Sequence, residues 1–290
     1  MTFRFNLKGN GRSAIAASVK PPATGEVMQC SMIRFSLSFT ASLLATLVAV
    51  ASVHVALAAG VPANITAAVA DNARPDADKQ RDVNRKPGET LAFADVRTGE
   101  QIGELSPGGG YFSRILSKAV GPKGHVFAIV PLRSPTAPAD QPDRNAPTKA
   151  LAADPNYSNI SIVERVAGMV SLPAPVDLIF TAQNYHDLHN VPNLDMAAFN
   201  KSVFDALKPG GLYVIVDHSA QTGSGSRDTS TLHRIDEDTV RQEVTAAGFK
   251  IVAGSNILKN TADDRTAIVF DPTVRGKTDQ FILKFRKPKK

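Results

Sequence analysis

The chain has 290 residues, of which 43% are hydrophobic, so it can bury a sizeable core and is not a disordered chain. Its formal net charge is +6, but residues 1–59 hold five of the 33 basic and one of the 27 acidic residues. The 28 basic and 26 acidic residues that remain nearly balance, which excludes a nucleic-acid footprint, and we expect no nucleic-acid partner.

The only cysteine is Cys30, which excludes a disulfide framework, a thiolate metal site and a cysteine nucleophile from the rest of the chain. Near the other end, five of the residues from Lys284 to Lys290 are basic. We interpret this basic run as a solvated tail in preference to a binding patch.

An apolar segment from Phe35 to Ala58 follows Arg34 and ends in Ala-Leu-Ala, the small-x-small pattern of a signal-peptidase site. The segment predicts a cleaved signal peptide over residues 32–59 and a periplasmic or secreted protein. Translation from Met32 would give the signal peptide an ordinary basic start, so we interpret residues 1–31 as a gene-model extension. The alternative is an uncleaved membrane anchor, because the apolar run is long enough to span a bilayer.

Residues 60–86 are rich in Ala, Asp, Asn, Arg and Pro with little periodicity, which indicates a linker or a loose N-terminal segment. Helix and strand signals then alternate. We expect a helix at 89–97, a strand at 101–105, a helix at 111–120 and a strand at 125–130. The proline-rich stretch 131–148 is interpreted as a surface insertion without regular structure.

The alternation resumes after this insertion. We expect strands at 159–164 and 176–182, a helix at 194–207, a strand at 212–216, a helix at 236–247, and strands at 249–253 and 280–285. Repeated βα units predict a parallel sheet, and two final strands with no helix between them should pair antiparallel. The sequence therefore predicts one α/β domain over residues 87–287.

The strongest local signal is an apolar strand, a glycine cluster and a helix in succession, with the sequence QIGELSPGGGY from Gln101 to Tyr111. Glycine lets the backbone bend sharply and lie against a ligand, and the next helix offers unpaired N–H groups to an anionic group. The alternative is a tight turn without a ligand. A dinucleotide fingerprint would need Gly or Ala where the chain has Ser113, which disfavours an NAD-dependent reductase.

An acidic residue at the strand end, followed by glycines, is instead the methyltransferase pattern, and Glu104, Gly108 and Gly110 have that spacing. At this point the chain resembles the class I methyltransferases that use S-adenosyl-L-methionine. More narrowly, it resembles a bacterial family of exported, predicted methyltransferases of unassigned substrate. Four segments carry the resemblance: ELSPGGGYF at 104–112, DLIF leading into NYHD at 177–187, ALKPGG at 206–211, and LHRID through AGF at 232–249.

The resemblance implies a Rossmann-like α/β fold, with a seven-stranded, mostly parallel sheet and a C-terminal antiparallel strand pair. It also implies S-adenosyl-L-methionine as the cofactor and a small-molecule or envelope-borne methyl acceptor. The methionine end of the cofactor would lie against the loop, with cofactor-binding residues Glu104, Ser106, Gly108, Gly109, Gly110, Tyr111 and Asn184. Asn184 and Tyr185, after the fourth strand, would face the transferred methyl group.

Two positions depart from the superfamily pattern. The second strand ends in Val130, where an acidic residue usually holds the ribose, and Met169 stands where an acidic residue often contacts adenine. Neither apolar side chain can accept those hydrogen bonds. The alternative function is therefore a catalytically inactive, methyltransferase-like module that binds a ligand or interacts with the envelope.

Polar residues follow the fourth and fifth strands, at the sheet edge where open α/β folds bind ligands. The candidate catalytic residues are His186, Tyr185 and His218, with either histidine as a general base, or else as a cap on a strand. We expect no metal, although a zinc or iron site remains an alternative on residue types, from His186, Asp187, His189 and His218. His233 and Arg234 precede the last helix, where they would form either a substrate lid or a surface cap.

Overall fold

The computed structural model describes residues 60–133, 138, 140–165 and 168–289. The expected signal peptide at 32–59 and the expected extension at 1–31 lie outside these described residues. Within the described part of the chain, no helix combines the length and the apolar character needed to cross a membrane.

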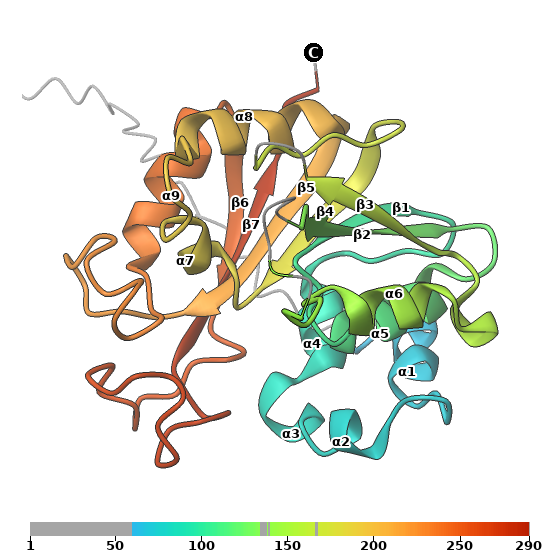
Figure 1. Ribbon diagram of the computed structural model, residues 1–290, viewed down its shortest axis with the longest axis horizontal. Coiled ribbons are helices and arrows are strands. Elements are labelled where there is room, and N and C mark those ends of the chain that lie inside the picture. Colours follow the sequence, from blue (N-terminus) through green and yellow to red (C-terminus); the bar gives the residue numbers. More distant parts are fainter. Residues whose placement is uncertain (1–59, 134–137, 139, 166–167, 290) are drawn as a thin grey trace, which may run out of the picture. The chain divides into compact units, whose positions relative to one another are not determined.

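Seven strands form one sheet in the order β3-β2-β1-β4-β5-β7-β6 (Figure 1). The first five strands are parallel, and β7 runs antiparallel to both of its neighbours, β5 and β6. Their bounds are β1 Gln101–Leu105, β2 His125–Pro131, β3 Ile160–Arg165, β4 Val176–Ala182, β5 Leu207–His218, β6 Lys250–Ser255 and β7 Gln280–Arg286. The predicted α/β class, with a mostly parallel sheet and a C-terminal antiparallel pair, is confirmed.

The strand order reverses between β1 and β4, which lie side by side although β2 and β3 come between them in the chain. In open α/β sheets the carboxyl ends of the strands leave a crevice at such a reversal, and ligands bind there. The glycine cluster directly follows β1, and the Asn184 segment directly follows β4. The topology therefore brings two of the expected site segments together.

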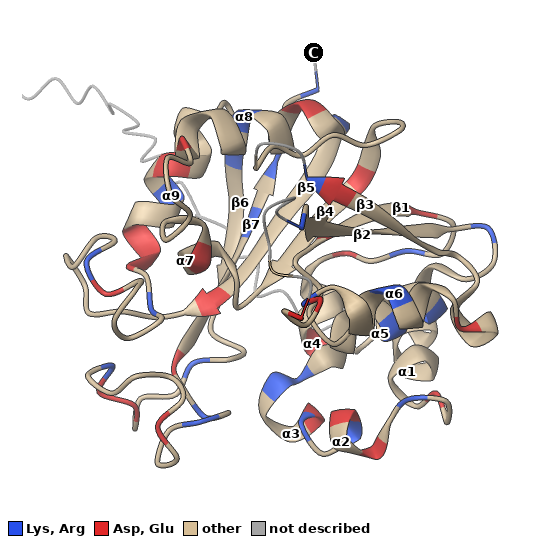
Figure 2. Cartoon of the chain, viewed as in Figure 1, with Lys and Arg blue, Asp and Glu red and all other residues tan. Residues whose placement is uncertain are grey.

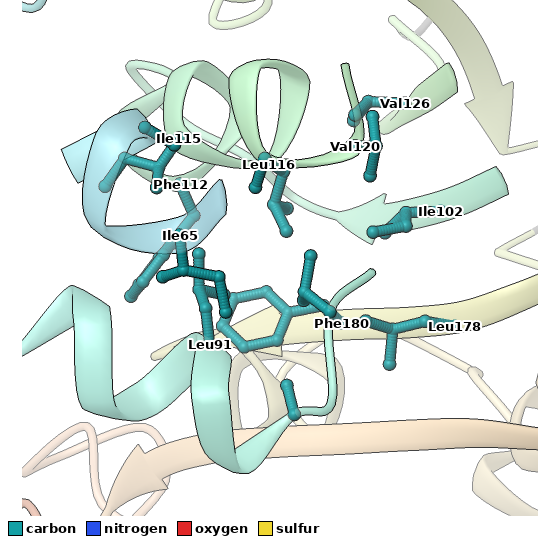
Figure 3. Packing of buried hydrophobic residues seen from close by; sticks show 14 of the residues in the cluster. Ile65, Leu91, Ile102, Phe112, Ile115, Leu116, Val120, Val126, Leu178 and Phe180 are labelled. Atoms are coloured by element: carbon teal, nitrogen blue, oxygen red, sulfur yellow. The ribbon is translucent and has the colours of Figure 1, made fainter. Parts of the chain in front are cut away.

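Alternate side chains of the strands enter two apolar layers. On one face Ile102, Leu178 and Phe180 pack with residues from α1, α4 and α5, as Figure 3 shows. On the other face Ile179 and Tyr213 pack with residues from α7, α8 and α9. These helices span α1 Ala63–Val69, α4 Pro87–Phe93, α5 Tyr111–Val120, α7 Tyr185–Leu188, α8 Met196–Ala206 and α9 Glu237–Ala246.

Residues 60–86 are not the linker or loose segment that their composition suggested. They form α1, α2 (Asp76–Lys79) and α3 (Asp82–Arg85), and α1 packs along α5. Ile65 is fully buried there, and Asn64 Nδ2 donates to the Ala119 carbonyl over 3.1 Å. Helices this short have little stability in isolation, so their tertiary contacts stabilise them, and composition does not report such contacts.

The proline-rich stretch also ends differently from the prediction. Its final residues begin α6 (Ala146–Ala152), a helix that was not predicted, and the short 3₁₀ turn Pro155–Tyr157 follows. Thr148 and Leu151 are the buried residues of α6. Because both contact the glycine loop, this helix supports the candidate site and is not a surface insertion.

The basic run that starts at Lys284 is only partly a solvated tail: Lys289 is exposed, but Lys284 and Lys287 are held by the fold. Lys284 lies in β7 and its Nζ binds Asp95 over 2.8 Å. Lys287 Nζ donates to the Phe204 and Leu207 carbonyls over 2.8 and 2.7 Å, at the C-terminus of α8, where a positive charge is favoured by the helix dipole. Figure 2 shows basic and acidic residues interspersed along the helices and loops.

Candidate functional site

The loop from Ser106 to Gly110 connects β1 to α5 at the crevice. Ser106, Gly108 and Gly110 have φ angles of 51°, 58° and 80°, the left-handed region that favours glycine. A Cβ on Gly110 would lie 2.4 Å from Leu151 Cδ2, whereas a Cβ on Gly108 would have no atom within 4 Å. Gly110 is therefore required for packing against α6, and Gly108 presents bare backbone to open space.

The N-terminus of α5 has no side-chain cap. Its N-cap residue is Gly110, and no side chain accepts a hydrogen bond from the first N–H groups of the helix. The loop itself is held from outside, because Thr148 Oγ1 donates to the Gly108 carbonyl over 2.7 Å and Arg114 donates to the Gly109 carbonyl over 2.8 Å. A rigid loop followed by an uncapped helix end can bind a carboxylate or another anion.

Glu104 lies beneath the loop at the end of β1 and is only 4% exposed. Its Oε2 accepts a hydrogen bond from Ser113 Oγ over 2.5 Å. Burial raises the pKa of Glu104 to about 7, although the hydrogen bond from Ser113 and the charge of Arg85 oppose the rise. The side chain therefore titrates near neutral pH, unlike an exposed glutamate.

Helices α2 and α3 lie over the start of α5. The Tyr111 hydroxyl donates to Asp82 over 2.6 Å, and Asp82 also binds Arg74. Arg114 pairs with Asp78 over 3.0 Å. These contacts attach the N-terminal helices to the same helix end that carries the loop, so the predicted site residue Tyr111 is a side-chain anchor for this cover.

Asn184 is close to the loop, as predicted. Its Nδ2 donates to the Ser106 carbonyl over 3.1 Å and to the Ala182 carbonyl over 2.6 Å. The end of β4 is thus tied to the end of β1 across the crevice.

Tyr185 points elsewhere. Its side chain is fully buried, its hydroxyl donates to Glu243 over 2.7 Å, and it accepts from Asn200 Nδ2 over 2.8 Å. Burial, followed by the charge of Glu243, raises the pKa of Tyr185 well above its ordinary value. The side chain packs in the layer of α7, α8 and α9, so the prediction that it faces the transferred methyl is not supported by this geometry.

His186 is 2% exposed and sits against Asp217 at the end of β5. Its Nδ1 lies 2.8 Å from Asp217 Oδ1, and its backbone N–H donates to Asp217 Oδ2 over 2.7 Å. Burial by itself lowers the pKa of His186, but the charges of Asp217 and Asp187 outweigh it and raise the pKa to about 10. The raised pKa favours the protonated ring, which argues against His186 as the general base.

His218 is the opposite case. Burial lowers its pKa to about 4 and its Nδ1 lies 2.7 Å from Thr278 Oγ1. The lowered pKa favours the neutral ring, which can accept a hydrogen bond but is a weak base.

His218 also lines a cavity of about 650 Å³ between the N-terminal helices and the segment before β7. Gln183 and Gln280 line it from the ends of β4 and β7. Three of the lining residues are arginines and none is acidic: Arg81, Arg85 and Arg275. A cavity with this lining suits a ligand that carries a negative charge.

The remaining predicted residues separate into two groups. His189 Nε2 lies 3.2 Å from Glu243 Oε2, away from the other histidines, and the fully buried Arg234 binds both oxygens of Asp263. His233, in contrast, reaches His186, with 3.3 Å between His233 Nδ1 and His186 Nε2. Neither this pairing nor the cavity arginines were predicted, since neither follows from spacing along the chain.

The two positions that depart from the superfamily pattern offer no polar group for a nucleoside. Val130 is 1% exposed near the end of β2, and Met169 is half-buried. A cavity of about 340 Å³ lies next to this strand end, and its lining includes Leu132, Arg133 and Asn145.

No protein-family model matches the chain. No sequence among the curated proteins matches it either. Solved structures do. A SAM-dependent methyltransferase from Aquifex aeolicus is 19% identical, with a TM-score of 0.51, covering 74% of this chain and 98% of that one. This chain has the class I methyltransferase fold.

A second structure with this fold, the S-adenosylmethionine-dependent methyltransferase from Mesorhizobium loti, is 16% identical with a TM-score of 0.50. The match covers 71% of this chain and 99% of that one. Both enzymes are matched over nearly their whole length, so the methyltransferase-like domain of this chain carries the complete fold. At such identities the likeness extends to the fold and not to individual site residues.

Proposed function

We propose that this chain is an exported methyltransferase that uses S-adenosylmethionine to methylate an acceptor carrying a negative charge. The observation that carries the proposal is the glycine loop at the reversal of the strand order, with Gly108 open to solvent and the N-terminus of α5 uncapped. The fold shared with two S-adenosylmethionine-dependent enzymes supports the same cofactor.

The residues of the loop fit the methionine end of that cofactor. Its carboxylate would take the free N–H groups at the start of α5, and bare backbone at Gly108 allows close approach. The buried Glu104 lies beneath the loop, where its negative form favours the ammonium and sulfonium charges of the ligand. The bound cofactor supplies an electrophilic methyl group.

The nucleoside end would have to be held without the usual acidic residues. The 340 Å³ cavity beside β2 is the available space, with Leu132 for apolar contact and Asn145 as a polar neighbour. Asn145 Nδ2 already donates to the Pro131 carbonyl over 2.8 Å, which leaves the amide oxygen as an acceptor. The lining also contains Asp143, but its oxygens already accept from Lys149 Nζ and from the Asn145 backbone N–H, so we expect weaker nucleoside binding than in enzymes with a ribose acid.

The acceptor would occupy the 650 Å³ cavity. Arg275 is the arginine best suited to bind it. Arg81 pairs with Asp78 and Arg85 donates to Gln183, whereas among the described residues the Arg275 guanidinium has neither a carboxylate nor an amide partner. His218 lines the same cavity, and its neutral ring can accept a hydrogen bond that orients the acceptor nucleophile.

Calorimetric titration of the purified protein with S-adenosylmethionine and S-adenosylhomocysteine tests the proposal. We expect binding to the wild type and loss of binding in Gly108→Asp, because the added carboxylate would occupy the space and repel the ligand carboxylate. Gly99→Asp is a matched control, since Gly99 also has a positive φ and open space, but lies at the amino end of β1.

Absence of heat at millimolar ligand would refute the enzyme and support the inactive, ligand-binding or envelope-interaction module. Equal affinity of Gly108→Asp and Gly99→Asp would mean that the ligand binds elsewhere.

Export has its own test. If the signal peptide is cleaved, the mature protein should begin at Ala59 or Gly60. N-terminal sequencing of protein recovered from the producing cells measures this. An intact Met32 terminus would support the uncleaved anchor instead.

A further inference from the structure

Three side chains from two distant segments converge beside the cavity that His218 lines. His186 and Asp187 belong to α7, and His233 lies in the loop before α9. His186 Nε2 is 3.3 Å from Asp187 Oδ1 and 3.3 Å from His233 Nδ1, and the third side of this triangle, from His233 Nδ1 to Asp187 Oδ1, is 3.4 Å. Three potential ligand atoms thus form a nearly equilateral triangle.

Hydrogen bonds account for only two sides of this triangle, because Asp187 Oδ1 can accept from both rings, and the 3.3 Å contact between the two ring nitrogens is then left without one. An imidazole nitrogen has a single in-plane direction, for one N–H or one lone pair. His186 Nε2 therefore cannot bond well to Asp187 and to His233 at once, and the same holds for His233 Nδ1. A cation between the three atoms would satisfy all of them together.

The dimensions suit such an ion. A regular tetrahedron whose corners lie about 2.0–2.1 Å from its centre, the length of Zn–N and Zn–O bonds, has edges of about 3.3–3.4 Å. The three measured sides equal this edge length. Two imidazoles and one carboxylate are also ligand types that Zn²⁺ and other first-row divalent ions prefer over Mg²⁺ or Ca²⁺.

Asp217 provides the support that metal-binding histidines commonly have. It is fully buried, and its Oδ1 lies 2.8 Å from His186 Nδ1, on the ring nitrogen that faces away from the triangle. Its oxygens also accept the backbone N–H groups of His186 and His218 over 2.7 and 2.8 Å. A carboxylate fixed in this way keeps the proton on Nδ1 and leaves the Nε2 lone pair for a metal.

The triangle is reachable from solvent. The side chains of Asp187 and His233 are 51% and 29% exposed, so an ion can enter from their side. The triangle also lies beside the 650 Å³ cavity, which Phe270 and His218 line. The ring centroids of His233 and Phe270 are 4.8 Å apart, and those of His186 and His218 are 6.0 Å apart.

From this geometry we propose that His186 Nε2, Asp187 and His233 Nδ1 bind a divalent transition-metal ion, with Zn²⁺ as the ion that the spacing fits. Three protein ligands leave a fourth position for water or an acceptor oxygen, as in catalytic zinc sites and unlike closed structural ones. This site differs from the set His186, Asp187, His189 and His218 considered from sequence, because His189 and His218 bond to Glu243 and Thr278.

The test is a Zn²⁺ titration of the tag-free full chain after chelator treatment, by competition with a coloured chelator, with Co²⁺ absorption spectra as a second readout. We expect one ion per chain. His233→Ala and Asp187→Ala, which alter partly exposed side chains, should weaken binding about 100-fold or more, and the supporting variant Asp217→Asn about 10- to 100-fold.

His125→Ala is the matched control, because this half-buried histidine lies at the amino end of β2, at the opposite sheet edge, and its loss should leave affinity unchanged. His189→Ala should also bind normally. Circular dichroism melts establish that each variant is folded. The proposal is wrong if the wild type takes up no ion at millimolar Zn²⁺, or if His233→Ala and Asp187→Ala bind as tightly as the wild type. The titration contains no S-adenosylmethionine, so its result is independent of the proposed methyltransferase activity.

Discussion

Replacing Glu104 by glutamine removes the charge from a buried group while keeping its shape and its hydrogen bond with Ser113. Burial raises the pKa of Glu104 from 4.5 to about 7, so the folded protein binds this proton more tightly than the unfolded chain. By linkage, the group costs no stability below pH 4.5, an increasing amount as the pH rises from 4.5 to 7, and a constant amount above 7.

The cost follows from the size of the shift. A difference of about 2.5 pKa units corresponds to about 3 kcal/mol at pH 8, and to about 1 kcal/mol at pH 5, where only the first part of the titration has occurred. Glutamine titrates at neither pH. The free energy of unfolding of Glu104→Gln, relative to wild type, should therefore rise by about 2 kcal/mol between pH 5 and pH 8.

Urea denaturation of both proteins at pH 5, 6, 7 and 8 measures this difference, and Glu164→Gln serves as a control. Glu164 is exposed in β3, and its replacement should change the free energy of unfolding by less than about 0.5 kcal/mol at each pH. A difference between Glu104→Gln and wild type that stays constant across this range would refute the electrostatic reasoning. A difference that falls with pH would mean that folding lowers the pKa of Glu104.

Three further substitutions have definite expectations, each measured by urea denaturation. Gly110→Ala should cost about 2–4 kcal/mol, because its Cβ meets Leu151 at 2.4 Å in a left-handed conformation; if adding Leu151→Ala recovers none of this loss, the clash is not its cause. Arg234→Met should cost about 3–5 kcal/mol by leaving Asp263 buried without its partner, and a neutral effect would contradict that pairing. Tyr185→Phe should lower the free energy of unfolding by about 1–3 kcal/mol and leave the calorimetric affinity for S-adenosylhomocysteine unchanged. A large loss of affinity would mean that the Tyr185 hydroxyl contacts the cofactor after all.

The sheet could be predicted because its strands carry their own signals. A parallel strand buried on both faces is a short, continuous apolar run, and the strand predicted at 176–182 coincides with β4. The start of β5 was not predicted correctly. The Lys208 to Gly211 turn was expected to precede the strand, but pairing with β4 begins at Leu207 and includes a register shift. Pairing across strands, which one strand's sequence does not encode, decides that boundary.

The N-terminal helices and the metal-ligand triangle could not be predicted for a different reason. The N-terminal helices depend on contacts such as that of Asp82 with Tyr111, which are 29 residues apart in the chain. The triangle depends on the contact of His186 with His233, which are 47 residues apart. No local periodicity links such pairs. The glycine loop was predictable because its strand, turn and helix are contiguous, and because left-handed backbone conformations favour glycine locally.

The position of β7 has a consequence for how this domain is made. Although it is the last described strand to leave the ribosome, it lies inside the sheet, between β5 and β6. Its pairing places Phe281 opposite Asp217 and Gln280 opposite His218. A nascent chain that lacks these residues cannot form the β5–β7 and β6–β7 pairs. Synthesis thus completes the sheet only after residue 286 has emerged, and until then β5 and β6 each present an unpaired edge, the kind of surface on which β-strands aggregate.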